Sequence, residues 1–284
     1  MKISTNIFIL LITLSLILIS SINCLEVAPN GMEDDLKKDE ALKLDNSEQT
    51  QQDTPGSSPE PGNIFHDIHG NKIDYSNPAL YLKTGNQSEL EEQYIKEISN
   101  QLNIISKDIK NIGVIFKWKQ NHFKTYSAGG KFIGKITVNQ IMEENALSGC
   151  HDHGLILVSV LRKYEFPAIM VDAAGIQWAL DFAEGKQNGF KGHIFIEVYV
   201  KDRWILIDST SGEYIENYNP LNSVIPLTDQ GEGKGYFALF KGLDPEDYGI
   251  NSNKQLTEYL KQFAGKIESI ELTFPLYTIK RLIK

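Results

Sequence analysis

The chain has 284 residues, of which 41% are hydrophobic and 23% charged, and this is the composition of an ordinary globular protein. Its length allows one large domain or two small ones. The net charge is -9 and no basic stripe is visible in the sequence, so nothing here points to nucleic acid as a partner.

The first 23 residues predict an export signal. Lys2 gives a positive start, and residues 7–19 are apolar apart from one threonine and one serine. This run is short for a membrane span, which favours a signal peptide. Cys24 follows directly and resembles the acylated cysteine of bacterial lipoproteins. We therefore expect an extracytoplasmic protein, either secreted or attached to a membrane surface through a lipid on Cys24.

Residues 24–62 carry most of the negative charge. They hold ten acids and three bases, whereas residues 63–284 hold 27 acids and 24 bases. Because this stretch is rich in Gln, Ser and Pro and poor in aromatic residues, it cannot bury enough apolar surface to fold. The sequence predicts a disordered acidic tether at 24–62 and a folded domain with a C-terminal extension at 63–284.

Two helices are predicted in the first half of this domain. Ser88 with Glu91 three residues later is typical of a helix N-terminus, and we expect a helix from there to Ile109. Its apolar residues recur at helical spacing: Leu90, Tyr94, Ile98, Leu102 and Ile105. The segment 135–146, KITVNQIMEENA, predicts a short second helix.

Cys150 opens the most apolar helix of the sequence. Residues 150–164, CHDHGLILVSVLRKY, predict a helix that is buried nearly all round and that Pro167 ends. A cysteine there is either a small core residue or a nucleophile. After the turn at 148–149, the backbone N–H groups and dipole of the first helical turn would favour a Cys150 thiolate. If Cys24 is lipidated or removed, no second cysteine remains for a disulfide.

Three strands are predicted after the helix: AIMVDAAG, HIFIEVYV and RWILIDST. The last two form a hairpin across residues 201–202. In the predicted register residue 200 lies opposite residue 203, residue 198 opposite residue 205, and residue 195 opposite residue 208. This register makes the two apolar faces coincide, whereas a slip by one residue would bury charges. The other face, which carries His193, is expected to lie away from the core.

His193 and Asp208 are the candidate base and orienting acid. In the predicted register they are diagonal neighbours on one face of the hairpin, close enough for their side chains to meet. A carboxylate beside an imidazole fixes the ring tautomer and stabilises the imidazolium. His193 is therefore the best candidate base among the six histidines of the chain.

The remaining features predict no cofactor and no metal. His151 and His153 are two residues apart in a helix, so their side chains point apart, and no further cluster completes a site. Asp152 is expected to cap the helix or to contact the sheet. Residues 234–250 are expected to form a loop beside the core, and residues 252–263 a helix.

These blocks together resemble the transglutaminase-like superfamily. They are Gly149-Cys150-x-Asp152, the apolar helix ending at Leu161-Arg162 and followed by Pro167-Ala168, GHIFIEVYV and RWILIDST. The blocks come in the order of the family, with 43 residues from Cys150 to His193 and 15 from there to Asp208. The resemblance covers about residues 88 to 215.

The resemblance implies an α+β fold with a papain-like core, in which the cysteine helix packs on an antiparallel sheet. It implies that Cys150 is the nucleophile, His193 the base and Asp208 its orienter. The oxyanion would bind the backbone N–H of Cys150 and an upstream side chain, for which Trp118, Gln120 and Tyr126 are candidates.

Three functions remain open at this point. The first is hydrolysis of peptide or amide bonds by Cys-His-Asp acyl transfer, with a protein or peptide as substrate. The second is crosslinking, in which a lysine amine resolves the same acyl-enzyme. The third is a non-catalytic surface binding module that keeps the fold. The intact Cys, His and Asp favour the two enzymes, and the lack of a calcium-loop pattern disfavours a calcium-activated crosslinker.

Overall fold

The computed structural model describes residues 63–125, 133–187, 189, 191–227 and 234–283. The predicted leader at 1–23 and tether at 24–62 lie outside these residues. Within the described ranges, no helix is both long and apolar enough to cross a membrane.

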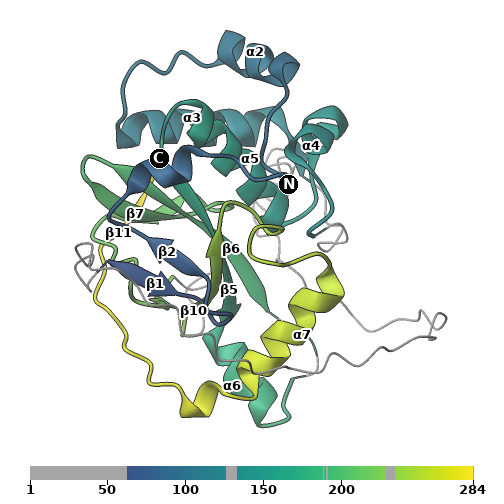
Figure 1. The fold of residues 1–284 in the computed structure, drawn as a ribbon, viewed down its shortest axis with the longest axis vertical. Coiled ribbons are helices and arrows are strands. Elements are labelled where there is room, and N and C mark those ends of the chain that lie inside the picture. The colour runs from purple at the N-terminus through teal and green to yellow at the C-terminus, as the bar shows by residue number, and fades with distance from the viewer. Residues whose placement is uncertain (1–62, 126–132, 188, 190, 228–233, 284) are drawn as a thin grey trace, which may run out of the picture.

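The centre of the fold is a seven-stranded sheet whose neighbouring strands are all antiparallel (Figure 1). Its strands, in spatial order, are β11 (Ile279–Arg281), β8 (Glu213–Ile215), β7 (Arg203–Asp208), β6 (Gly192–Val200), β5 (Ala168–Gly175), β10 (Tyr236–Gly242) and β9 (Val224–Ile225). Two further strand pairs are β1 (Ile64–His66) with β2 (Lys72–Asp74) and β3 (Lys124–Thr125) with β4 (Ala146–Leu147).

The helices lie in two groups around this sheet. In chain order the helical elements are η1 (Pro78–Leu82), α2 (Glu92–Gln101), α3 (Ile109–His122), α4 (Val138–Glu144), α5 (Cys150–Lys163), α6 (Ile176–Ala183), α7 (Asn253–Ala264) and η2 (Ile267–Ser269). In Figure 1, α2 to α5 gather above the sheet and α6 and α7 lie at its lower end. The helix α5 packs directly on β5 and β6. The predicted fold class, α+β with the Cys150 helix on an antiparallel sheet, is confirmed.

The predicted hairpin register is also confirmed. Val200 lies opposite Arg203, Val198 opposite Ile205, and Phe195 opposite Asp208. Alternate residues of β6, among them Ile194 and Ile196, form one core with α5. The hydrophobic alternation selected the correct register because a shifted one would turn these side chains away from the helix.

The opposite face of β6 is buried as well, so the expectation that it lies away from the core was wrong. His193 is 8% exposed, and Phe195 and Glu197 are not exposed at all. Phe195 belongs to a second core that includes Tyr218 and Tyr236. These covering residues come from segments after the hairpin. The sequence of the hairpin alone therefore cannot predict that this face is buried.

A buried ion pair lies on this second face. Lys241 Nζ on β10 is 2.6 Å from Glu197 Oε1 on β6, and neither side chain is exposed. Tyr75 and Tyr218 donate their hydroxyl hydrogens to the same carboxylate, at 2.6 and 2.8 Å. Because Tyr75 directly follows the β1–β2 hairpin, the cluster attaches the N-terminal part of the domain to the sheet.

Two other predictions need correction. The helix predicted from Ser88 to Ile109 begins at Glu92 and ends at Gln101, and Ser88 caps nothing. Its Oγ instead accepts a hydrogen bond of 3.0 Å from the buried guanidinium of Arg162.

The loop expected at 234–250 contains β10, which pairs with the central strand β5. The short helix α4 and the helix α7, which Ser252 caps, agree with the sequence.

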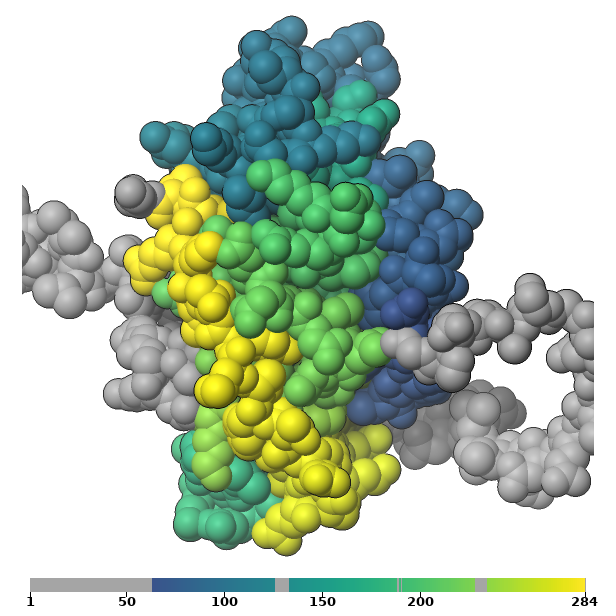
Figure 2. Space-filling model, turned by 90° about the vertical axis from the view of Figure 1, so that its left-hand side faces the viewer, coloured from purple at the N-terminus to yellow at the C-terminus, as the bar shows by residue number. Residues whose placement is uncertain are grey.

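The C-terminal extension completes the sheet. The strand β11 pairs with β8 at its edge, and Leu282 N donates to Gly212 O at 3.0 Å. In Figure 2 the yellow C-terminal segment crosses the surface beside the green residues that follow β6.

Candidate functional site

Cys150 is the first residue of α5, as predicted. It follows Gly149, which serves as N-cap, and its side chain is buried at 3% exposure. Asp152 fixes the turn before the helix, because its Oδ2 accepts hydrogen bonds from Ser148 N at 2.7 Å and Ser148 Oγ at 2.6 Å. Burial raises the pKa of Asp152. The dipole of the helix favours a negative charge at this end.

His193 and Asp208 are brought together by the hairpin. His193 Nε2 lies 3.0 Å from Asp208 Oδ1. The same carboxylate oxygen accepts the backbone N–H groups of Thr210 and Ser211, at 2.8 and 3.1 Å. Burial raises the pKa of Asp208, but His193 and these N–H donors outweigh it, and the net pKa lies well below the usual range. Asp208 therefore stays ionised beside the imidazole.

The helix α5 packs on the strand that carries His193. Gly154, one turn after Cys150, packs so tightly on Ile194 that an added Cβ would be 2.6 Å from Ile194 Cγ2. Ile194 directly follows His193 in β6. The ring of His193 itself packs against Phe195 and Tyr236, with ring centroids 4.8 and 5.4 Å apart. The Gly154 contact thus fixes α5 on one face of β6 near its start, while the His193 ring packs with Phe195 and Tyr236 of the second core.

A buried lysine, which the sequence analysis did not identify, supports this end of the site. Lys119 on α3 is completely buried, and its Nζ donates to His153 Nδ1 at 2.9 Å and to the carbonyl oxygen of Ser209. Burial lowers the pKa of Lys119 to about 7, although Asp208 acts in the opposite direction. Burial and the charge of Lys119 hold the pKa of His153 well below its usual value, so His153 is a neutral acceptor.

A second imidazole–carboxylate pair lies beside Cys150. His151 Nε2 is 2.9 Å from Asp172 Oδ2 on β5, and His151 Nδ1 is 4.0 Å from Cys150 Sγ. The two histidines of the HDH motif therefore have different partners, His151 toward β5 and His153 toward α3. No group of three metal-ligating side chains is found in the described part of the chain.

Two of the three candidate oxyanion donors do not fit that role. Trp118 donates its indole N–H to Gln101 Oε1 at 2.8 Å, and Gln120 is exposed. Tyr126 lies outside the described residues. Tyr248 is a better candidate, because its hydroxyl is buried and has no hydrogen-bond partner among the described residues. Burial raises the pKa of Tyr248 well above its usual value, and the charges of Asp172 and Cys150 contribute to this rise.

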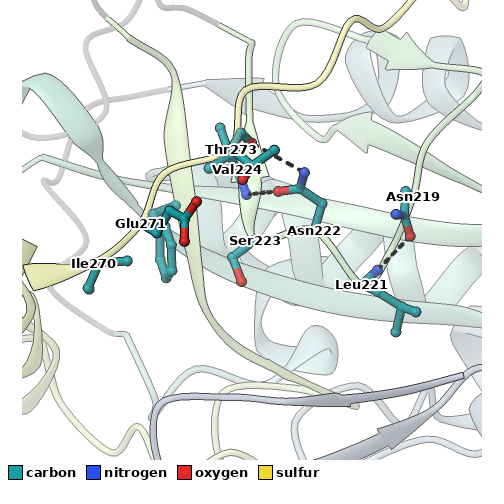
Figure 3. Close-up of a pocket in the computed structure, with 9 residues that line it drawn as sticks. Asn219, Leu221, Asn222, Ser223, Val224, Ile270, Glu271 and Thr273 are labelled. Atoms are coloured by element: carbon teal, nitrogen blue, oxygen red, sulfur yellow. Dashed lines mark hydrogen bonds between the residues drawn. The ribbon is translucent and has the colours of Figure 1, made fainter. Parts of the chain in front are cut away.

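A surface pocket of about 390 Å³ lies elsewhere on the domain, between residues 219–224 and 270–273 (Figure 3). Asn222 connects its two sides, since its Nδ2 donates to Thr273 O at 3.2 Å and its Oδ1 accepts from Val224 N at 2.8 Å. The residues that line this pocket include neither Cys150 nor the His193–Asp208 pair, so we treat it as separate from the candidate site.

Comparison with known proteins gives matches among solved structures alone. No family model matches the chain, and no curated protein matches it. One similar structure is a candidate cysteine protease from Cytophaga hutchinsonii, with a TM-score of 0.43 and 17% identity over 63% of this chain and 50% of that one. Another is a transglutaminase (TGase), with a TM-score of 0.29 and 16% identity over 64% of this chain and 49% of that one. The chain thus covers about half the length of each structure.

Proposed function

We propose that the chain is an exported transglutaminase-like cysteine enzyme that hydrolyses peptide or amide bonds. Cys150 is the nucleophile, His193 the general base and acid, and Asp208 the orienting carboxylate. The observation that supports this most directly is the 3.0 Å contact of His193 with an ionised Asp208 at the start of β6, the strand on which the Cys150 helix packs.

The proposed reaction runs through an acyl-enzyme. The Cys150 thiolate attacks the carbonyl carbon and forms a C–S bond. The His193 imidazolium then gives its proton to the leaving amine as the C–N bond breaks. Water attacks the thioester and passes a proton to His193, the acid is released, and the thiolate returns. Asp208 holds the imidazole in one tautomer throughout.

The developing oxyanion needs hydrogen-bond donors. We assign the first to the backbone N–H of Cys150, because it lies at the N-terminus of α5, where the helix dipole favours a negative charge. We assign the second to the Tyr248 hydroxyl. Tyr248→Phe is expected to lower kcat by about 10²–10³ and to leave stability unchanged or higher, since the hydroxyl has no other partner in the described structure. Unchanged kcat would remove Tyr248 from the mechanism.

Export is part of the proposal and rests on the leader at 1–23 and on Cys24. Mass spectrometry of the mature N-terminus distinguishes a free N-terminus after secretion from a lipidated Cys24. The expected partner is a protein or peptide substrate. Adding a soluble primary amine during turnover measures whether water or an amine resolves the acyl-enzyme, with the free acid as the expected product.

Alkylation across a range of pH tests the nucleophile. Iodoacetamide is expected to label Cys150 rapidly below pH 7, at a rate that His193→Ala lowers. His66→Ala, a change of an exposed histidine on β1, is the matched control and should label as the unmodified protein does. Labelling with an ordinary midpoint near 8.5 that is indifferent to His193 would favour the non-catalytic binding module.

A further inference from the structure

The sulfur of Cys150 has an imidazole beside it that belongs to the next residue in the chain. His151 Nδ1 lies 4.0 Å from Cys150 Sγ, and its ring is buried at 4% exposure. Within this distance an ionic partner strongly affects whether a thiol keeps its proton. The position of the His151 ring therefore affects whether the Cys150 thiol keeps its proton.

Asp172 determines which nitrogen of His151 faces the sulfur. A carboxylate can only accept, so the 2.9 Å contact of Asp172 Oδ2 with His151 Nε2 places a hydrogen on Nε2. In the neutral ring Nδ1 is then the acceptor that faces the S–H group. In the protonated ring Nδ1–H points toward a thiolate.

Asp172 is an unusual residue for its position. It is the one charged residue of β5, it is 1% exposed, and its Oδ1 has no hydrogen-bond partner among the described residues. A buried carboxylate is costly unless it is paired, and His151 is its side-chain partner in the described structure.

Two other ionisable groups act on this pair: Asp152 lies on α5 itself, and Tyr248 follows β10. Asp152 is already bound to Ser148. Asp172 is therefore the carboxylate that directly contacts His151.

We propose that His151, held by Asp172, is a second imidazole partner of Cys150 that maintains the thiolate, while His193 transfers protons to and from the reacting groups. The thiol proton moves from Sγ to His151 Nδ1 and stays there, which leaves a thiolate beside an imidazolium, and Asp172 remains a carboxylate. His193 takes its first proton from solvent, gives it to the leaving amine and regains one from the water that attacks the thioester. This inference rests on the proposed function. It assigns the maintenance of the thiolate to His151 and proton transfer during the reaction to His193.

The test measures the thiolate directly in the full-length protein. The ultraviolet absorbance of the thiolate is followed against pH for the unmodified protein, His151→Gln and His193→Ala, with His66→Gln as control. The side-chain amide introduced by His151→Gln can still donate to Asp172, so this variant removes the titrating nitrogen and keeps the buried contact. We expect it to raise the titration midpoint of Cys150 by about 1–3 pH units. We expect His193→Ala to abolish turnover with a smaller change in the midpoint.

The outcomes separate the two proposals. A low midpoint in the unmodified protein that His151→Gln leaves unchanged would overturn the second imidazole and leave the proposed function intact. A midpoint near 8.5 in the unmodified protein would overturn both. If His151→Gln does not fold, nitrogen NMR of the unmodified protein gives the answer. The His151 ring should lose its proton when Cys150 is alkylated, and a ring unaffected by alkylation contradicts the proposal.

Discussion

Replacing Lys119 by methionine tests the electrostatics of the site. Methionine keeps most of the volume of the side chain and removes the charge. The Nζ group of Lys119 is fully buried, and its contacts are His153 Nδ1, the carbonyl oxygen of Ser209 and the ring of Phe116. No carboxylate forms an ion pair with Lys119 in the described structure, so burial dominates its titration.

The expected effect is a dependence of stability on pH. The pKa of Lys119 is about 7 in the folded protein, against 10.5 for an exposed lysine. Between these values the unfolded chain binds a proton that the folded chain does not, so the unmodified protein gains stability as pH rises. The gain relative to Lys119→Met is about 1.4 kcal/mol per pH unit, or roughly 2–3 kcal/mol between about pH 6 and about pH 9.

Urea unfolding of the two proteins at a series of pH values measures this difference. Lys117→Met, a change of an exposed lysine on the same helix, is the control and should show no such slope. The reasoning is refuted if the free energies of unfolding of the unmodified protein and Lys119→Met differ by the same amount at every pH.

Three further predictions concern packing and charge. Gly154→Ala should lower the free energy of unfolding by about 1–3 kcal/mol because its Cβ would clash with β6, whereas Gly265→Ala, which has room, should be neutral or stabilising in the same urea assay. Lys241→Met should cost about 3–5 kcal/mol because it leaves the Glu197 carboxylate buried without its cation, and adding Glu197→Leu should recover part of that loss. Since the pKa of Asp208 is lowered from 3.8 in the folded state, the stability advantage over Asp208→Asn should be present at neutral pH and disappear as pH falls below about 4. An advantage that persists in acid would contradict this origin.

The sequence was most informative where local pattern and burial agree. The hairpin register followed from alternation in β6 and β7, and it brought His193 beside Asp208 as expected. The helix α5 was recognisable because its apolar residues run almost without interruption from Leu155 to Leu161. Both features depend on residues that are close in the chain.

The features that were missed depend on distant segments. Residues 234–250 are aromatic and Gly-rich, which predicts a loop, but they contain β10. This strand is buried on both faces, so YFALFKG shows no simple alternation. Ser88 has the pattern of a helix cap, yet the buried Arg162, 74 positions later, binds its hydroxyl. No pattern within either segment reports its partner.

The sequence does contain a pattern that marks the buried charged residues near the site. Lys119 follows Ile112, Ile115 and Phe116 at helical spacing, so it occupies the buried stripe of α3. Asp172 is likewise a single acid inside an apolar strand. A charged residue on an apolar face is costly unless it is paired, and such positions are the ones to examine for function.

The nucleophilic role of Cys150 is tested most directly by trapping the acyl-enzyme. The full-length protein is mixed with an activated acetyl ester, and the intact mass and the modified peptide are measured. We predict a single acetyl group on Cys150, absent in Cys150→Ala and released more slowly in His193→Ala than in the His66→Ala control. Acetylation that does not occur, that occurs equally on other side chains, or that is released at the same rate without His193 would contradict the account.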